Sequence, residues 1–260
     1  DTINRNAILP FSVDVESLTP EKVLALPQTV ASESGIPLIL YMKEFQNVIR
    51  LSESAFTMAS LEKAWLRQHN VFFIITGSGV NAMKSVFEER KVFYYLTEPI
   101  TLKPFPRREL VSFITREFLE VGREIQREQA EEIIDATGGN IWYIKQFCAI
   151  CHCIPAGYIN KGIVRQGRLA LMELNAPRFR HIMSDLTHNQ INFLRAISDG
   201  CRKLSGSECL EKYNLNSSAN VFRLKDAFRK KELVTFDRND EPVIIDSLFA
   251  VWLRDFYFSR

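Results

Sequence analysis

The sequence predicts an α/β region, then an all-helical region, then a small helical domain that ends in a β-hairpin. Three observations support this order. Short apolar runs alternate with helical patterns over residues 20–102, helical periodicity alone continues from residue 107 to about residue 176, and three short helices precede two strands in the C-terminal part. The predicted fold class is therefore α/β plus α, with domains over residues 1–105, 106–178 and 179–260.

Capping and strand signals define the α/β region, which follows a polar connector. Thr19 and Pro20 are typical of a helix start and predict a helix to Ser32. Two short, bounded apolar runs, Leu38–Met42 and Val71–Thr76, are typical of buried parallel strands in a three-layer sheet. The remaining expected elements are helices over Ser54–Asn70 and Asn81–Arg90 and extended segments at Lys91–Leu96 and Ile100–Leu102.

The next region is expected to be helical throughout. Periodicity predicts helices over Arg107–Val121, Gln126–Thr137 and Asn140–Ile154, and Gly138–Gly139 is a C-cap signal between the last two.

Three short helices and two strands follow, an arrangement typical of a winged helix. We expect Thr187 to cap a helix to Ser198, Ser205 to cap one to Tyr213, and Asn216 or Ser217 to cap one to about Glu232. The expected wing strands are Leu233–Phe236 and Pro242–Ile245, and the expected last helix is Ser247–Phe256.

The composition limits the class of protein. The 260 residues include 33 basic and 31 acidic side chains, and a net charge of +2 excludes a strongly basic nucleic-acid coat protein. No apolar run approaches the roughly 20 residues that span a bilayer, and the first residues lack a secretory pattern. Five unevenly spaced cysteines do not suggest a disulfide framework. We therefore expect a cytoplasmic protein without a membrane partner.

Polar residues follow both predicted strands, at the end where open parallel sheets bind ligands. Glu44 stands where the second acid of a Walker-B element orients the attacking water. Lys43 stands where the first acid would reach magnesium, and a cation there would instead compete with magnesium for phosphates. Thr76 and Ser78 can present a hydroxyl beside a nucleotide. Taken alone, each pattern also fits an ordinary buried strand and a strand-to-helix turn that uses Gly77 for backbone freedom.

Residues 77–85 resemble a phosphate-binding loop only superficially. The motif requires a glycine immediately before Lys84 and another five residues earlier, where this sequence has Met83 and Ser78. No other segment matches the motif, so we expect no phosphate cradle in the chain as given.

The segment Cys148–Cys153 contains a C-x-x-C-H pattern, which is formally that of haem attachment. It falls on a predicted amphipathic helix, and a zinc site would require four ligands with no second pair nearby. Buried helix cysteines are the expected interpretation, and no metal site is predicted.

The third helix of the expected winged helix carries basic residues that suit DNA phosphates and base edges. The candidates are Arg223, Lys225, Arg229 and Lys230. Residues 181–260 nevertheless contain 12 basic and 11 acidic side chains, which is less basic than DNA-binding domains usually are. A DNA-binding surface and a protein-interaction surface therefore stay equal alternatives.

Six segments, in order, resemble the archaeal-type P-loop ATPases, which are related to the signal-transducing (STAND) branch of the AAA+ fold. Two of them, LPQTVASESGIPLIL (residues 26–40) and TLKPFPRREL (101–110), fit the order of the family. ILYMKEFQNV (residues 39–48) is similar to the acidic strand of that family, and FFIITGSGVNAM (72–83) to the next strand. TGGNIWYIKQF (137–147) resembles the signature of the helical lid, and IIDSLFAVWLRDF (244–256) resembles the ending of the winged helix. The likeness spans about residues 20–258.

This resemblance implies a partial P-loop ATPase core, a helical lid and a winged helix, with ATP and Mg²⁺ as cofactors. Glu44 would match the water-orienting acid, Ser78 or else Thr76 the polar sensor, and Arg90 an arginine that reaches the phosphate of a neighbouring subunit in an oligomer. The phosphate loop of the family would lie upstream of Asp1, and its magnesium-linked Asp corresponds to Lys43.

The expected function is therefore an ATP-binding ATPase that couples nucleotide state to movement of the lid and the winged helix. The alternatives are a non-hydrolysing scaffold and a DNA-binding winged-helix protein.

Overall fold

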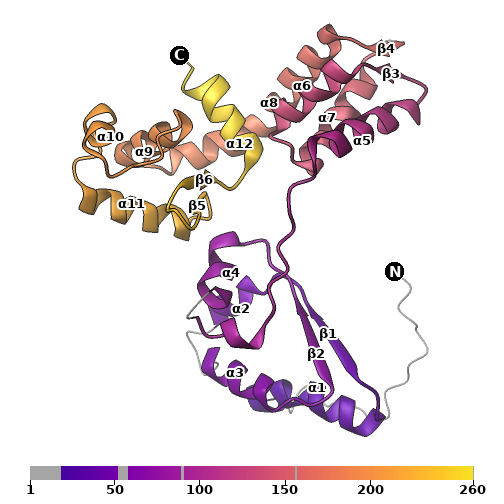
Figure 1. The fold of residues 1–260 in the computed structure, drawn as a ribbon, viewed down its shortest axis with the longest axis vertical. Helices are drawn as coiled ribbons and strands as arrows, with labels where there is room; N and C mark the ends of the chain where they lie inside the picture. The colour runs from indigo at the N-terminus through magenta and orange to yellow at the C-terminus, as the bar shows by residue number, and fades with distance from the viewer. Residues whose placement is uncertain (1–18, 52–57, 89–90, 156, 260) are drawn as a thin grey trace. The chain divides into compact units, whose positions relative to one another are not determined.

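The computed structural model describes residues 19–51, 58–88, 91–155 and 157–259. The chain divides into two compact units, residues 1–100 and residues 101–260 (Figure 1). Among the helices of the described residues, none combines the length and the hydropathy of a membrane-spanning segment.

A two-stranded parallel sheet organises the first unit. β1 (Leu38–Met42) pairs with β2 (Val71–Ile75) along its whole length. The predicted boundaries of β1 are confirmed, and Thr19 caps the first helix as expected. The helices of this unit are α1 (Pro20–Ser34), α2 (Gln46–Leu51), α3 (Met58–Leu66), α4 (Val80–Phe87) and a 3₁₀ turn, η2 (Tyr94–Leu96).

Among the described residues, helices and loops cover one face of this sheet. On that side a cluster of aromatic rings forms the core, in which Phe45 and Phe93 are fully buried and contact Trp65 and Phe87. On the other face Ile39, Tyr41, Phe72 and Ile74 are each more than half exposed. The expectation of strands buried on both faces is therefore wrong for the described residues.

The segment Lys91–Leu96 is not extended, contrary to the prediction. Phe93 is fully buried and its backbone N donates to Val86 O over 3.0 Å, so the chain folds back on α4 and ends in η2. Ile100–Leu102 forms no strand either. Pro99 and Pro104 flank it and offer no N–H to a ladder.

The second unit is mostly helical. Its elements are α5 (Arg107–Leu119), β3 (Glu124–Ile125), α6 (Arg127–Thr137), α7 (Ile141–Cys153), β4 (Tyr158–Ile159), α8 (Lys161–Ser184), α9 (His188–Ser198), α10 (Ser207–Lys212), α11 (Ser218–Lys230), β5 (Val234–Phe236), β6 (Pro242–Ile244), α12 (Ser247–Trp252) and a π-helical turn, η3 (Leu253–Tyr257). β3 and β4 form a short parallel pair, and β5 and β6 form the antiparallel wing. Thr187 and Ser217 cap α9 and α11 as expected, whereas Gly206 rather than Ser205 precedes α10.

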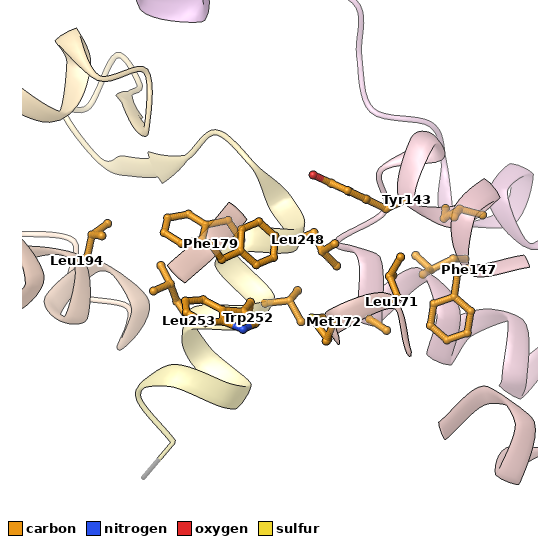
Figure 2. Close-up of a cluster of buried hydrophobic side chains, with 14 of the residues drawn as sticks. Tyr143, Phe147, Leu171, Met172, Phe179, Leu194, Leu248, Trp252 and Leu253 are labelled. Carbon is orange, nitrogen blue, oxygen red and sulfur yellow. The ribbon is translucent and has the colours of Figure 1, made fainter. Parts of the chain in front are cut away.

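One hydrophobic core runs through the helical part and the winged helix of this unit. Phe179, in α8, is fully buried, and its ring centroid lies 5.3 Å from that of Phe249 and 5.5 Å from that of Trp252. Figure 2 labels Phe179 and Met172 of α8 together with Leu248 and Trp252 of α12 in this cluster. The expected boundary between residues 178 and 179 therefore lies inside a continuous helix.

Candidate functional site

The polar residues that follow β1 and β2 meet at the carboxyl ends of the two strands. Thr76 N donates to Met42 O over 2.9 Å, and Phe45 N donates to Thr76 O over 3.0 Å, so pairing continues past the strand ends. Ser78 Oγ consequently donates to Glu44 Oε2 over 2.6 Å. The expected proximity of Glu44 and Ser78 is present, and their chemical roles stay predictions.

The turn after β1 aims the Glu44 side chain. Glu44 has a φ of 56°, in the left-handed region that L residues rarely adopt. Phe45, the next residue, is fully buried in the aromatic cluster. A sparsely populated backbone conformation persists only where its surroundings hold it, and the buried Phe45 ring provides that anchor.

A third polar side chain joins the pair. Gln46 Nε2 donates to Glu44 Oε2 over 2.5 Å and to Ser78 Oγ over 3.1 Å. The hydrogen bonds from Ser78 and Gln46 hold the pKa of Glu44 below its ordinary value, and the Lys43 charge lowers it further. Sequence reasoning did not select Gln46, although its position two residues after the acid, in the segment that resembles the ATPase strand, was the available signal.

Gly77 is required for space rather than for backbone freedom. A Cβ at this position would lie 2.5 Å from both Gln46 Oε1 and Met83 Sδ. Since real Cβ atoms do not approach other atoms that closely, a side chain at residue 77 would displace Gln46 or Met83. The turn after β2 is thus shaped to fit the turn after β1.

The other predicted residues of this site are placed differently. Thr76 Oγ1 lies 3.1 Å from the Tyr41 hydroxyl on the exposed face of the sheet. Lys43 is exposed at the end of β1, beside Glu44. Arg90 lies outside the described residues.

The side chains at the strand ends do not fit a magnesium site. They offer one carboxylate, Glu44, while Lys43 takes the place of the first, magnesium-linked acid. The Lys43 ammonium group would repel a cation from this place, and among the described residues no three His, Cys, Asp or Glu side chains are grouped so as to hold a metal ion. The Mg²⁺ that the resemblance implies therefore has little support in this donor set.

The cysteine segment lies on α7, and the prediction of buried cysteines is confirmed for Cys148 and Cys151 but wrong for Cys153, which is exposed. Cys148 and Cys151 are buried, and burial raises the pKa of each thiol to about 12, so both are protonated at neutral pH. A Cβ at Gly167 of α8 would lie 2.6 Å from Cys151 Sγ. These thiols therefore fill the contact between two closely packed helices.

In the winged helix, two of the four basic candidates are turned toward the wing. Lys225 is only 8% exposed, pairs with Asp240, and lies 5.0 Å from the centroid of the Phe236 ring. The Arg229 guanidinium lies 4.5 Å from the same ring and 3.8 Å from Asp240. The assignment of Lys225 to a DNA-facing surface is therefore not supported, since its ammonium group is committed inside the domain.

The outer face of α11 has a mixed character. Arg223 is exposed, and Lys230 pairs with Asp226 of the same helix over 2.9 Å. Phe222, next to Arg223, is 71% exposed. This face therefore presents an aromatic ring beside Arg223 and an ion-paired lysine rather than a continuous basic stripe.

The Gly138–Gly139 turn, which follows α6, packs against the start of α12 in the winged helix. Gly138 has a φ of 61°, and a Cβ there would lie 2.7 Å from Ser247 Cβ. Ser247 Oγ donates to Thr137 O over 2.8 Å. A cleft of about 390 Å³ opens beside this turn; it is lined by Pro104, Phe105, Arg107, Leu110, Ile134, Asp135, Gly138, Gly139 and Arg254.

A polar cluster also connects the helical part to the winged helix. The Tyr143 hydroxyl donates to Asp246 Oδ2 over 2.9 Å, and Arg178 donates to both Asp246 Oδ2 and the Tyr143 hydroxyl over 2.7 Å. Burial raises the pKa of Tyr143 to about 12. Because Asp246 also accepts from Leu248 N and Phe249 N at the start of α12, this cluster fixes α12 to α7 and α8.

Comparisons with known proteins agree with this architecture. Residues 177–255 match the family model of a probable winged helix domain. The fold is similar to that of the Walker-type ATPase paby2304 of Pyrococcus abyssi, with a TM-score of 0.68 and 18% sequence identity over 95% of this chain and 73% of that chain. No curated protein matches the chain. The chain therefore has a fold similar to that of a Walker-type ATPase, its C-terminal part matches a winged helix domain, and neither match points to the signal-transducing branch.

Proposed function

We propose that the protein binds ATP at the carboxyl ends of β1 and β2 and that nucleotide state is coupled to movement of the lid and the winged helix. The observation that carries this proposal is the hydrogen bond between Ser78 and Glu44 on adjoining parallel strands, within the fold of a Walker-type ATPase. Membership of the signal-transducing branch is part of the proposal.

Glu44 acts as the acceptor that orients a water molecule. Its lowered pKa keeps the carboxylate ionised at neutral pH, and an ionised carboxylate accepts hydrogen bonds strongly. Ser78 acts as the sensor: its hydroxyl leaves Glu44 and donates to a phosphate oxygen when nucleotide is bound.

Lys43 favours nucleotide binding over hydrolysis. Its ammonium group, exposed beside Glu44, pairs with phosphate oxygens as a point charge. The same charge repels a metal ion from the place where the magnesium-linked acid would stand. We therefore propose tight binding with slow turnover.

The lid and the winged helix move together in this scheme. They share one core around Phe179, and the Tyr143–Arg178–Asp246 cluster links them by hydrogen bonds. Since neither part separates without exposing that core, nucleotide acts on the second unit as a whole.

A titration of the intact protein with labelled ATP tests the proposal. We expect saturable binding, weakened about tenfold in Lys43→Ala because a charge-assisted contact is lost. Lys145→Ala, an exposed lysine on α7, serves as the matched control and binds as the unmodified protein does. Absence of saturable binding removes the nucleotide role.

A protein-binding winged helix on a non-hydrolysing body is the second candidate function. The exposed Phe222 ring favours it. The ion pairs of Lys225 and Arg229 with Asp240 favour it as well, because they reduce the positive charge available to DNA. We expect weak binding to duplex DNA and no loss of salt dependence in Arg223→Ala. A slope of affinity against salt that falls by about 0.9 in this variant would instead show a phosphate contact and favour DNA.

A further inference from the structure

We propose that Gln46 is a positioning residue. It donates a hydrogen bond that holds the Glu44 carboxylate in place, and this bond remains when Ser78 turns from Glu44 to a phosphate oxygen. This inference rests on the function proposed above, because it concerns the acid that orients water. Gln46 begins α2, while Ser78 follows β2. The residue therefore connects the two turns at the strand ends.

Three polar side chains form a closed set of contacts. The Gln46 amide nitrogen donates to Glu44 Oε2 over 2.5 Å and to Ser78 Oγ over 3.1 Å, and Ser78 Oγ donates to Glu44 Oε2 over 2.6 Å. Glu44 Oε2 thus accepts from two donors. If Ser78 turns to a phosphate oxygen, Gln46 still donates to the carboxylate.

The amide of Gln46 has only one orientation that suits its neighbours. Gln46 Oε1 is buried and accepts no hydrogen bond from the described residues. Leaving a buried carbonyl unsatisfied is unfavourable, yet the reversed amide would place that oxygen against the Glu44 carboxylate, where two acceptors repel each other. The Glu44 carboxylate therefore fixes the orientation of this amide, with Nε2 toward Glu44.

The neighbouring backbone leaves room for this side chain and for little else. A Cβ at Gly77 would lie 2.5 Å from Gln46 Oε1, and a Cβ at Gly79 would lie 3.1 Å from Gln46 Cγ. Two glycines thus line the space that Gln46 occupies. This packing is independent of the hydrogen bonds and limits the rotamers open to the side chain.

The test is an NMR titration of the Glu44 carboxyl carbon in the full chain, without nucleotide. Lys43, the charged neighbour that also lowers this pKa, is unchanged in every variant. We expect the pKa of Glu44 to rise toward its ordinary value in Gln46→Leu and again in the double variant with Ser78→Ala. Gln166→Leu, on the exposed face of α8, leaves it unchanged.

A Glu44 titration that is identical in Gln46→Leu and in the unmodified protein, while Ser78→Ala raises the pKa, would overturn the proposal. If Gln46→Leu does not fold, Gln46→Glu provides the second test. Two carboxylates in contact share a proton, so we expect their titration to split into two steps, the upper one above the ordinary pKa of glutamic acid. Two independent ordinary titrations would contradict the contact.

The ATP titration described above separates this proposal from the proposed function. Loss of the pKa effect with saturable ATP binding removes the role of Gln46 alone. A clear pKa effect without ATP binding keeps the positioning of Glu44 and removes the nucleotide.

Discussion

The two units of the chain differ in how far their apolar side chains are buried. In the second unit one core connects all parts of the fold, from Leu110 in α5 to Leu253 in η3. In the first unit helices cover one face of the β1–β2 sheet, and the other face exposes Ile39, Tyr41, Phe72 and Ile74. Parallel strands are usually covered on both faces. Among the described residues, the second unit therefore buries its apolar side chains in one continuous core, whereas the first leaves four of them exposed on one face of its sheet.

The largest expected effect tests the continuous core of the second unit. Phe179→Ala removes a fully buried ring from between the lid and α12 and should destabilise this unit by about 3–5 kcal/mol. Denaturant unfolding followed by fluorescence measures the loss. Phe222→Ala, at an exposed position of the same unit, should change stability by less than about 0.5 kcal/mol. Similar effects of the two changes would show that the core is not continuous.

A smaller effect is expected at the strand ends of the first unit. Gly77→Ala inserts a Cβ into the space of Gln46 and Met83 and should cost about 1 kcal/mol, since both are flexible side chains. It should also raise the pKa of Glu44 toward its ordinary value, because the Gln46 amide is displaced. Gly157→Ala is the control, because a Cβ there meets no atom within 4 Å.

An ion pair of the second unit should give a weak pH dependence. Arg107 donates to Asp135 over 2.6 and 3.0 Å and holds the pKa of that carboxyl below its ordinary value of 3.8. A lowered folded-state pKa stabilises the fold above the unfolded pKa, and this stabilisation is lost as the pH falls through the folded value. Because both side chains are largely exposed, we expect about 0.2–1 kcal/mol. In Arg107→Gln, unfolding curves should lose this contribution at pH 7 and differ little from the unmodified protein at pH 2.

The smallest effect on stability is expected on the open face of the sheet. Ile74→Thr keeps a β-branched side chain at an exposed position and should change the free energy of unfolding by less than about 0.5 kcal/mol. It should nevertheless reduce self-association at high concentration, measured by sedimentation, because exposed apolar patches promote contact between molecules. A large loss of stability would show instead that this face is covered within the chain.

Local chemistry made much of the fold predictable from the sequence. Thr19, Thr187 and Ser217 cap their helices by short-range hydrogen bonds, and such caps depend on residues only two or three positions away. The bounded apolar run Leu38–Met42 likewise predicted β1. The β3–β4 pair was not predicted, because strands of two residues have no hydrophobic periodicity.

The residues that sequence reasoning missed or misplaced depend on distant contacts. Lys91–Leu96 folds back because the Phe93 ring enters the aromatic cluster, which no local pattern reveals. Lys225 turns inward because Asp240 and Phe236 of the wing receive it. Gln46 meets Ser78, which lies 32 positions along the chain. In each case a tertiary partner overrides the local preference.

Helix α8 has a mechanical consequence. Its 24 residues span about 36 Å and contact α7 through Gly167 and α12 through Phe179. Pro177 lies inside this helix, two residues before Phe179, and a proline at such a position removes one backbone hydrogen bond and favours a bend. Part of any rotation of the lid would therefore be taken up by flexing at Pro177 before it reaches the outer face of α11.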